Sequence, residues 1–295
     1  MDWLIGLVPL PYPVAVVAVG TAVLGFVAGA LGPFAVLRGR SMFGDAMSHG
    51  TLPGVVVAFM VTGVKDPVSS LVGAAVFAGA AALVMIGLER AGRTPPDAAI
   101  GVALSASFTL GIVLLTRVSQ GGDADQSGLD AYLFGQAAGM VVRDVELTVG
   151  IGGLAVVLAV AFFRLLRSAT FDPQFTAVAG VPTWAVDAAS TVLLAVAVVL
   201  GVRTVGVILM VALLVAPAVA ARQLTTRLSG MIALSGLIGA VCGVAGALVA
   251  GRTELPTGPV IVLLATAAAL ASILLAPRRG ILARLHRRRA LAGAP

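Results

Sequence analysis

The sequence predicts an all-α polytopic membrane protein, a bundle of about nine transmembrane helices within a range of eight to ten. Hydrophobic residues make up 59% of the 295 residues, charged residues only 11%, and the mean hydropathy is +1.09. This composition excludes a soluble domain with a polar surface. The apolar runs are continuous and about 20 residues long, the length that a helix needs to cross the hydrocarbon core, whereas a transmembrane barrel would show alternating segments of about ten residues.

Each predicted helix is an apolar run that ends at a charged residue or at a segment rich in proline and glycine. The chain has 36 glycines, which permit close approach between membrane helices. In chain order, the predicted spans cover residues 14–37, ended by Arg38; 43–64, ended by Lys65; 68–88, ended by Glu89; 98–116, ended by Arg117; 145–165, ended by Arg167; 184–200, ended before Arg203; 205–221, ended by Arg222; 231–250, ended by Arg252; and 259–276, ended by Pro277.

The basic residues predict the orientation of the bundle. If successive spans alternate in direction, fourteen of the nineteen Lys and Arg residues lie on one side, and the other side receives five together with an acidic loop at 119–128. By the positive-inside rule the first side is cytoplasmic, so nine spans place the C-terminus inside and the N-terminus outside. The fourteen are Arg38, Arg40, Arg90, Arg93, Arg164, Arg167, Arg222, Arg227, Arg278, Arg279, Arg284, Arg287, Arg288 and Arg289.

The predicted domain organisation is simple. Residues 1–277 are expected to form a single transmembrane domain, and residues 278–295 a basic cytoplasmic tail. The opening segment lacks the basic region and cleavage site of a signal peptide, so none is expected. Because the arginines are dispersed over short loops and the tail, the expected partner is the lipid bilayer and not nucleic acid. The single cysteine, Cys242, allows no intramolecular disulfide and is expected to be a packing residue.

Asp45 and His49 are the strongest functional signal. They stand at i and i+4, so in a helix both side chains project from one face. Ionisable groups within a span are costly and mark functional sites by default, and a carboxylate with an imidazole suits zinc, manganese or iron better than magnesium or calcium. The structural alternative is a mutual hydrogen bond, or a cap by Ser41 or Asp45 at the start of the helix. On residue chemistry alone both interpretations stay open.

One copy of the chain supplies too few ligands, because two residues cannot complete a tetrahedral or octahedral shell. If the second span faced a two-fold axis, two aspartates and two histidines would surround one ion with a formal ligand charge of −2 and leave positions for water. Such a shell suits transient binding of a transported ion, which must enter and leave, better than a permanently bound cofactor.

Four stretches resemble the membrane permease subunits of bacterial ABC importers for zinc, manganese or iron. The run VLRGRSMFGDAMSHGTLPGVVVAF at 36–59 is similar to the hallmark of that family, with Gly50 where alanine is usual. The other three are FDPQFTAVAGVP at 171–182, VGVILMVALLVAPAVAARQL at 205–224 and LPTGPVIVLLA at 255–265. The resemblance covers essentially the whole chain, in the expected order.

The resemblance implies a multi-pass subunit of the bacterial plasma membrane, paired with a second permease subunit, a homodimer being the expected form. Its expected partners are two copies of a cytoplasmic ABC ATPase and an extracytoplasmic metal-binding protein. Asp45 and His49 match the family's metal-binding positions. The stretch 164–182 resembles the loop that docks on the ATPase, which makes Asp172, Pro173, Ala179 and Gly180 the expected coupling residues.

The residues themselves support parts of this interpretation. Asp172 followed by Pro173 is typical of a helix cap and first helical position, and Gly180 of a helix stop, so a short helix is predicted between them. Pro217 would remove a hydrogen bond within the seventh span and is a candidate gating position. The only lysine, Lys65, precedes Asp66 and Pro67, so the phosphate loop of an ATPase is missing and the chain is not expected to be an enzyme.

Two alternatives remain open at the level of sequence. One is a proton-coupled secondary metal carrier, although such carriers commonly show inverted repeats, and no convincing pair is found here. The other is a permease of the siderophore or cobalamin type, whose bulky substrate needs a wide neutral path and no Asp/His pair. The identity of the transported ion is not encoded in the two ligand types.

Overall fold

A computed structural model describes residues 11–39, 42–63, 67–92, 94–120, 137–276 and 280. Over these ranges the chain forms helices joined by turns, with no strand, which confirms the predicted fold class. Eight helices are long and apolar enough to cross a membrane. The second predicted span is the exception: its helix has 20 residues, but polar residues in its first half lower its hydropathy. The basic tail at 281–295 and most of the acidic loop lie outside the described residues.

The helix boundaries follow the sequence signals. Pro13 and Pro96 stand in the first turns of α2 and α5, where proline costs no hydrogen bond, and Gly63 ends α3 in the left-handed conformation. The helices are α2 (Tyr12–Leu37), α3 (Phe43–Thr62), α4 (Pro67–Arg90), α5 (Pro96–Ser119), α7 (Val142–Leu147), a π-helical turn (Thr148–Gly152), α8 (Gly153–Ala161), α9 (Phe163–Phe171), α10 (Pro173–Val178), α11 (Thr183–Val205), α12 (Val207–Leu224), α13 (Leu228–Thr253) and α14 (Thr257–Leu275).

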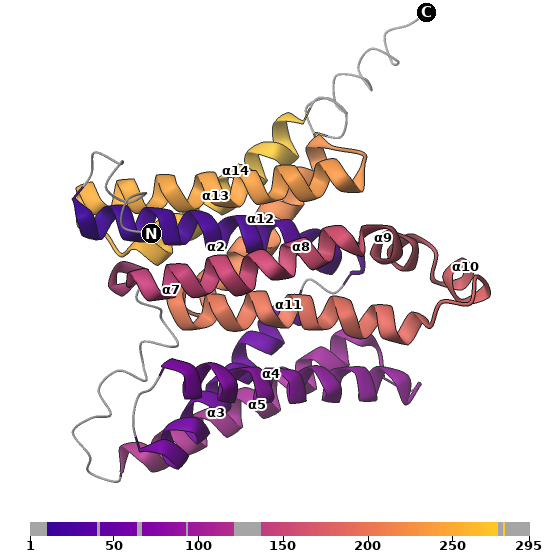
Figure 1. Ribbon diagram of the computed structural model, residues 1–295, viewed down its shortest axis with the longest axis horizontal. Helices are drawn as coiled ribbons and strands as arrows, with labels where there is room; N and C mark the ends of the chain where they lie inside the picture. The colour runs from indigo at the N-terminus through magenta and orange to yellow at the C-terminus, as the bar shows by residue number, and fades with distance from the viewer. Residues whose placement is uncertain are drawn as a thin grey trace, which may run out of the picture.

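The helices fall into three groups that lie one above another in Figure 1. α3, α4 and α5 pack together at the bottom of the view, and α2, α13 and α14 pack at the top. α11 and the α7–α8 rod run between them, and α12 contacts α2, α3, α11, α13 and α14. α9 and α10 extend beyond one end of the bundle, on the side that the arginines assign to the cytoplasm.

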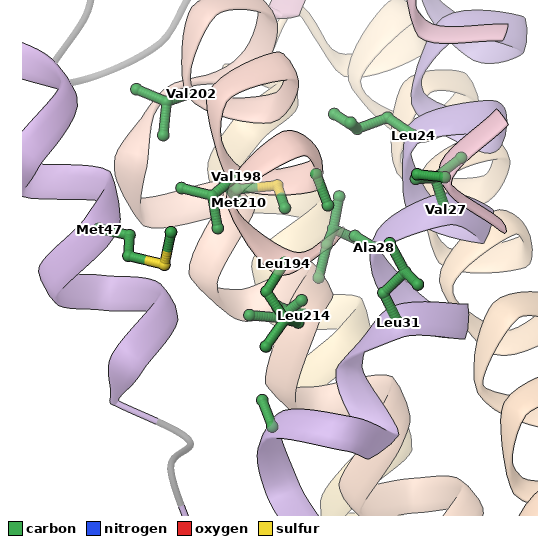
Figure 2. Packing of buried hydrophobic residues seen from close by; sticks show 14 of the residues in the cluster. Leu24, Val27, Ala28, Leu31, Met47, Leu194, Val198, Val202, Met210 and Leu214 are labelled. Carbon is green, nitrogen blue, oxygen red and sulfur yellow. The ribbon is translucent and has the colours of Figure 1, made fainter. Parts of the chain in front are cut away.

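The core lies where α2, α3, α11 and α12 meet (Figure 2). Met47 of α3 points towards Val198 of α11 and Met210 of α12, and all three side chains are buried. Because lipid tails are as apolar as these side chains, the stabilisation comes from close van der Waals packing and not from removal of water. This packing fixes the rotation of α3 about its own axis.

Glycines bring α2 and α13 into backbone contact, as their abundance predicted. A Cβ atom added to Gly25 would meet the backbone of Gly239, and one added to Gly243 would meet the carbonyl of Thr21. The Thr21 hydroxyl donates across the interface to the Gly243 carbonyl at 3.1 Å. This is the packing of small residues spaced four apart that membrane helices commonly use.

The break between the sixth and seventh spans differs from the prediction. The sequence placed Arg203 in a loop after residue 200, but α11 continues to Val205 and the chain turns at Gly206, whose φ is 83°. Arg203 therefore lies within the last turn of α11, where its Nη2 donates to Asp144 Oδ1 at 3.1 Å. The sequence did not reveal this partner, because Asp144 lies 59 residues away.

Candidate metal pathway

The start of α3 places Asp45 and His49 on a face that points away from the core. α2 ends at Leu37, the chain reverses through Gly39 at a φ of 70°, and α3 begins at Phe43. Phe43 and Met47 are fully buried against the core, so the residues displaced around the helix, Asp45 and His49, project from a different face.

The two side chains are in contact, as the spacing predicted. His49 Nε2 lies 3.5 Å from Asp45 Oδ1, and the side chains are 23% and 29% exposed, respectively. His49 Nδ1 is buried and has no hydrogen-bond partner among the residues that the structure describes. The imidazole also meets the ring of Phe108 of α5 edge-on, with 4.9 Å between the ring centroids. Phe108 and the helix backbone therefore hold the imidazole beside the carboxylate.

Asp45 does not cap the helix. The N-cap residue of α3 is Met42, and no side chain accepts a hydrogen bond there. Ser41, the other candidate cap, lies outside the described residues. A carboxylate in the first turn is still favoured by the helix dipole, but its oxygens are not used by the backbone. The carboxylate oxygens of Asp45 therefore remain available to a ligand.

Asp45 and His49 line a groove of about 760 Å³ between α3, α5, α12 and α14. The groove is otherwise apolar except for Thr266 of α14, which the sequence argument did not identify. Over the ranges that the structure describes, no three His, Cys, Asp or Glu side chains are grouped closely enough to hold a metal ion. The lining residues are Met42, Asp45, His49, Phe108, Val207, Ile208, Val211, Ala212, Val215, Ala216, Val219, Thr266, Ala269 and Leu270.

Pro217 lies in the middle of α12 and is buried, one residue away from the groove-lining Ala216. Because proline has no N–H, the carbonyl of Leu213 lacks its helical donor at this point. The structure thus places Pro217 behind the groove wall, and its role in gating stays a prediction.

The predicted coupling segment forms two short helices, α9 and α10, beyond the end of α8. Asp172 Oδ1 accepts the backbone N–H of Phe175 at 2.8 Å, Pro173 is the first residue of α10, and Gly180 has a φ of 80°. The capped helix is therefore present as predicted, with Ala179 as its C-cap.

Three apolar side chains on this segment are exposed, and sequence reasoning missed them: Phe171, Phe175 and Val178. They surround the predicted coupling residues Asp172, Pro173, Ala179 and Gly180, which are exposed as well. Apolar side chains that protrude from a polar end of a membrane protein are typical of a protein-binding surface. Their signal in the sequence is the aromatic–polar alternation of FDPQF.

A polar network ties this segment to the helix that precedes the metal pair. Arg38, at the end of α2, donates from Nη1 to Asp187 Oδ1 at 2.8 Å and to Ser190 Oγ at 2.7 Å. Its Nε donates to Thr170 Oγ1 of α9 at 3.4 Å. One guanidinium thus joins α2, α9 and α11 just before the turn that leads into α3.

The fold and the groove define a multi-pass membrane protein with a carboxylate–imidazole pair on an otherwise apolar face. Comparison with known proteins gives its family. The model of the ABC 3 transport family matches residues 12–276. A zinc transport system membrane protein of Treponema pallidum is 45% identical over 279 residues, which is 94% of each chain. A manganese transport system membrane protein of Bacillus subtilis is 43% identical over 272 residues, which is 92% of this chain and 62% of that protein.

A solved structure supports the same family. The structure of PsaBC from Streptococcus pneumoniae in complex with a Fab matches this chain with a TM-score of 0.79 and 33% identity. The match covers 92% of this chain and 94% of the matched chain. The chain belongs to the ABC 3 transport family, as the resemblance of its four stretches predicted. It is a multi-pass permease of the plasma membrane.

Proposed function

We propose that this chain carries a divalent transition metal ion into the cell as the permease subunit of an ABC importer. Zinc or manganese is the first expected cargo, and iron is a further candidate. The observation that carries the proposal is the contact between Asp45 and His49 in a groove that is otherwise apolar. The zinc and manganese names of the relatives support the metal class but do not choose between the two ions.

One groove supplies half of the site. An apolar face with a carboxylate and an imidazole needs both a cover and further ligands, and a second copy of the chain would supply both. Two copies place two carboxylates and two imidazoles around one ion, with a formal ligand charge of −2. Water would complete the shell, so the ion is held loosely enough to leave.

In this mechanism the chain makes and breaks no covalent bond. The ion arrives from an extracytoplasmic metal-binding protein and exchanges part of its hydration shell for the Asp45 oxygens and the His49 ring. Apart from Thr266, whose neutral hydroxyl is a weak ligand, the other side chains that line the groove are apolar, so the Asp45 and His49 pairs of the two copies form one shared stopping point for the ion. Closure of the two copies around this point and their reopening towards the cytoplasm would move it inwards.

The energy for this cycle comes from separate ATPase subunits. The sequence contains no phosphate loop, and α9 with α10 presents Phe171, Phe175 and Val178 at the end of the bundle. We propose that an ATPase docks on this segment, one on each permease copy. Asp172, Pro173, Ala179 and Gly180 would keep α10 in the docked shape.

The test is metal uptake by vesicles that contain the permease, its ATPase and the metal-binding protein. Asp45→Ala and His49→Ala are expected to abolish ATP-dependent accumulation of zinc or manganese while the complex still assembles. Asp97→Ala is the matched control, because it removes an exposed carboxylate from the first turn of α5. Normal uptake by either groove variant would refute the site, and uptake by the chain without an ATPase would favour the proton-coupled carrier.

A further inference from the structure

A second cavity, of about 790 Å³, lies between α9 and the turn that joins α12 to α13. Its lining comes from two segments that are far apart in the sequence, 163–172 and 226–229. Three of the lining residues are arginines: Arg164 and Arg167 from α9, and Arg227 from the turn. Arg164 and Arg167 belong to the stretch 164–182, but none of the three arginines is among the predicted coupling residues or the metal-pathway residues.

The fold explains why the arginines gather here. Arg164 and Arg167 are three residues apart on α9, so they share one face of the helix, while Leu166 and Ala169 are buried on the other. Arg227 is the N-cap residue of α13 and is brought opposite them by the turn from α12. All three arginines are solvent-exposed residues that line the cavity.

The positive charge of the cavity is not balanced within the described part of the chain, where no carboxylate forms an ion pair with any of the three arginines. Asp172 is the only acidic residue of the lining, and its Oδ1 caps α10 by accepting from the Phe175 N–H. Grouped like charges without a counter-ion repel one another and attract anions.

The uncharged polar groups of the cavity can also donate hydrogen bonds. Ser168, Thr226 and Ser229 contribute hydroxyls. The first turn of α13, a helix of 26 residues, starts at the cavity and has no side-chain cap, so its first N–H groups lack intrahelical acceptors. A guanidinium can donate two parallel hydrogen bonds to a phosphate. Together with the hydroxyls and the free backbone N–H groups, the arginines can therefore satisfy the oxygens of a phosphate group.

We infer that this cavity binds a phosphate group, presented by the headgroup of an anionic phospholipid or by a soluble phosphate. The lipid is the source that the position favours. Exposed apolar side chains lie beside the cavity at Phe162, where α8 meets α9, and at Leu224, where α12 ends. Such side chains belong among lipid tails, so the cavity lies level with the headgroups, on the side that the arginines assign to the cytoplasm.

The test is ligand binding to the purified full-length permease in detergent. The probes are phosphatidylglycerol, phosphatidylcholine and inorganic phosphate, and bound lipid is counted by native mass spectrometry. The variants are Arg164→Gln, Arg167→Gln and Arg227→Gln, which remove exposed side chains and should not unfold the chain. Arg252→Gln is the matched control, because it removes one exposed arginine from the opposite end of α13.

The wild type is expected to bind phosphatidylglycerol in preference to phosphatidylcholine. Each cavity variant should bind it at least about tenfold more weakly, the loss of one charge-assisted hydrogen-bonded pair, and Arg252→Gln should bind it normally. Binding of inorganic phosphate with the same dependence on the three arginines would support the site with a soluble source. If neither phosphatidylglycerol nor inorganic phosphate binds, or if Arg252→Gln weakens binding as much as the cavity variants do, the inference is overturned.

Discussion

Arg38 Nη1 lies 2.8 Å from Asp187 Oδ1, which joins the end of α2 to the start of α11. The same guanidinium reaches Thr170 on α9, the helix that leads into the predicted coupling surface. Seven residues after Arg38 comes Asp45 of the metal pair. A movement of α9 driven by an ATPase could therefore reach the α2–α3 turn through the Arg38 side chain, of which only 12% is exposed. We therefore expect Arg38 to act as a positioning residue for the proposed metal pathway.

Replacing Arg38 by lysine keeps the charge but removes the planar guanidinium that donates to Thr170, Asp187 and Ser190 at the same time. We expect Arg38→Lys to slow metal uptake several-fold while ATP hydrolysis continues, because the two ends of the network are uncoupled. The loss of stability should be small, about 1 kcal/mol or less, since Asp187 is 43% exposed and water screens the pair.

The measurement is the ratio of metal transported to ATP hydrolysed in reconstituted vesicles. Arg117→Lys, in the last turn of α5, is the matched control and should leave the ratio unchanged. A normal ratio for Arg38→Lys would show that the network only supports the fold.

The ion pair between Arg203 and Asp144 should matter more for stability. Both side chains are 15% exposed, so each charge has lost most of its water and depends on the other. Arg203→Gln or Asp144→Asn alone is expected to cost about 3 kcal/mol, because an unpaired charge stays behind in a poorly hydrated place. The double variant should cost clearly less than the sum of the two.

A double-mutant cycle measured by denaturation in detergent micelles separates these cases. Strictly additive costs would show that the two charges do not stabilise one another.

Backbone contact between α2 and α13 makes a prediction about glycine. Gly25→Ala and Gly239→Ala each add a methyl group where the opposing backbone already lies, so the helices must separate, at a cost of about 1–3 kcal/mol. Gly79→Ala in α4 is the control, because nothing lies near its added Cβ atom. It should be neutral or slightly stabilising, since alanine is the better helix former. Equal melting temperatures for all three variants would contradict the packing.

Local signals predicted the elements of this fold but not its long-range pairs. Asp172, Pro173 and Gly180 predicted the two ends of α10, because a capping carboxylate, a first-turn proline and a glycine with positive φ are local signals. The Asp45–His49 contact followed from spacing within one helix. Arg203 and Asp144 could not be paired, because nothing in one sequence specifies which of several charged residues lies opposite another across the bundle.

In the candidate site, too, the local features could be predicted from the sequence and the long-range contacts could not. Its two ionisable residues, Asp45 and His49, were predictable because polar side chains stand out in an apolar run. The groove around them was not, since Phe108, Val211 and Thr266 come from three other helices and are ordinary membrane residues in the sequence. The coupling segment was predicted by its caps, whereas its contact surface, Phe175 and Val178, became visible only when burial was known.

The groove makes a prediction about pairing. If a second copy covers it, residues on its walls approach their symmetry mates across the two-fold axis. Ile208 of α12 and Leu270 of α14 both line the groove and are exposed in the single chain. Since Cys242 is the only cysteine, Cys242→Ala gives a background free of thiols, and single cysteines at these two positions can then be oxidised in native membranes.

Ile208→Cys, Leu270→Cys or both are expected to form a covalent dimer, and Leu237→Cys is expected to stay monomeric. Leu237 is the matched control because it is an apolar residue, exposed to a similar extent, on α13, which contributes no side chain to the groove. A disulfide requires Cα atoms within about 7 Å of one another, so efficient cross-linking reports a specific interface and not random collision. Cross-linking at Leu237 without any at Ile208 and Leu270 would place the interface on α13, and the two Asp45–His49 pairs could not then share an ion.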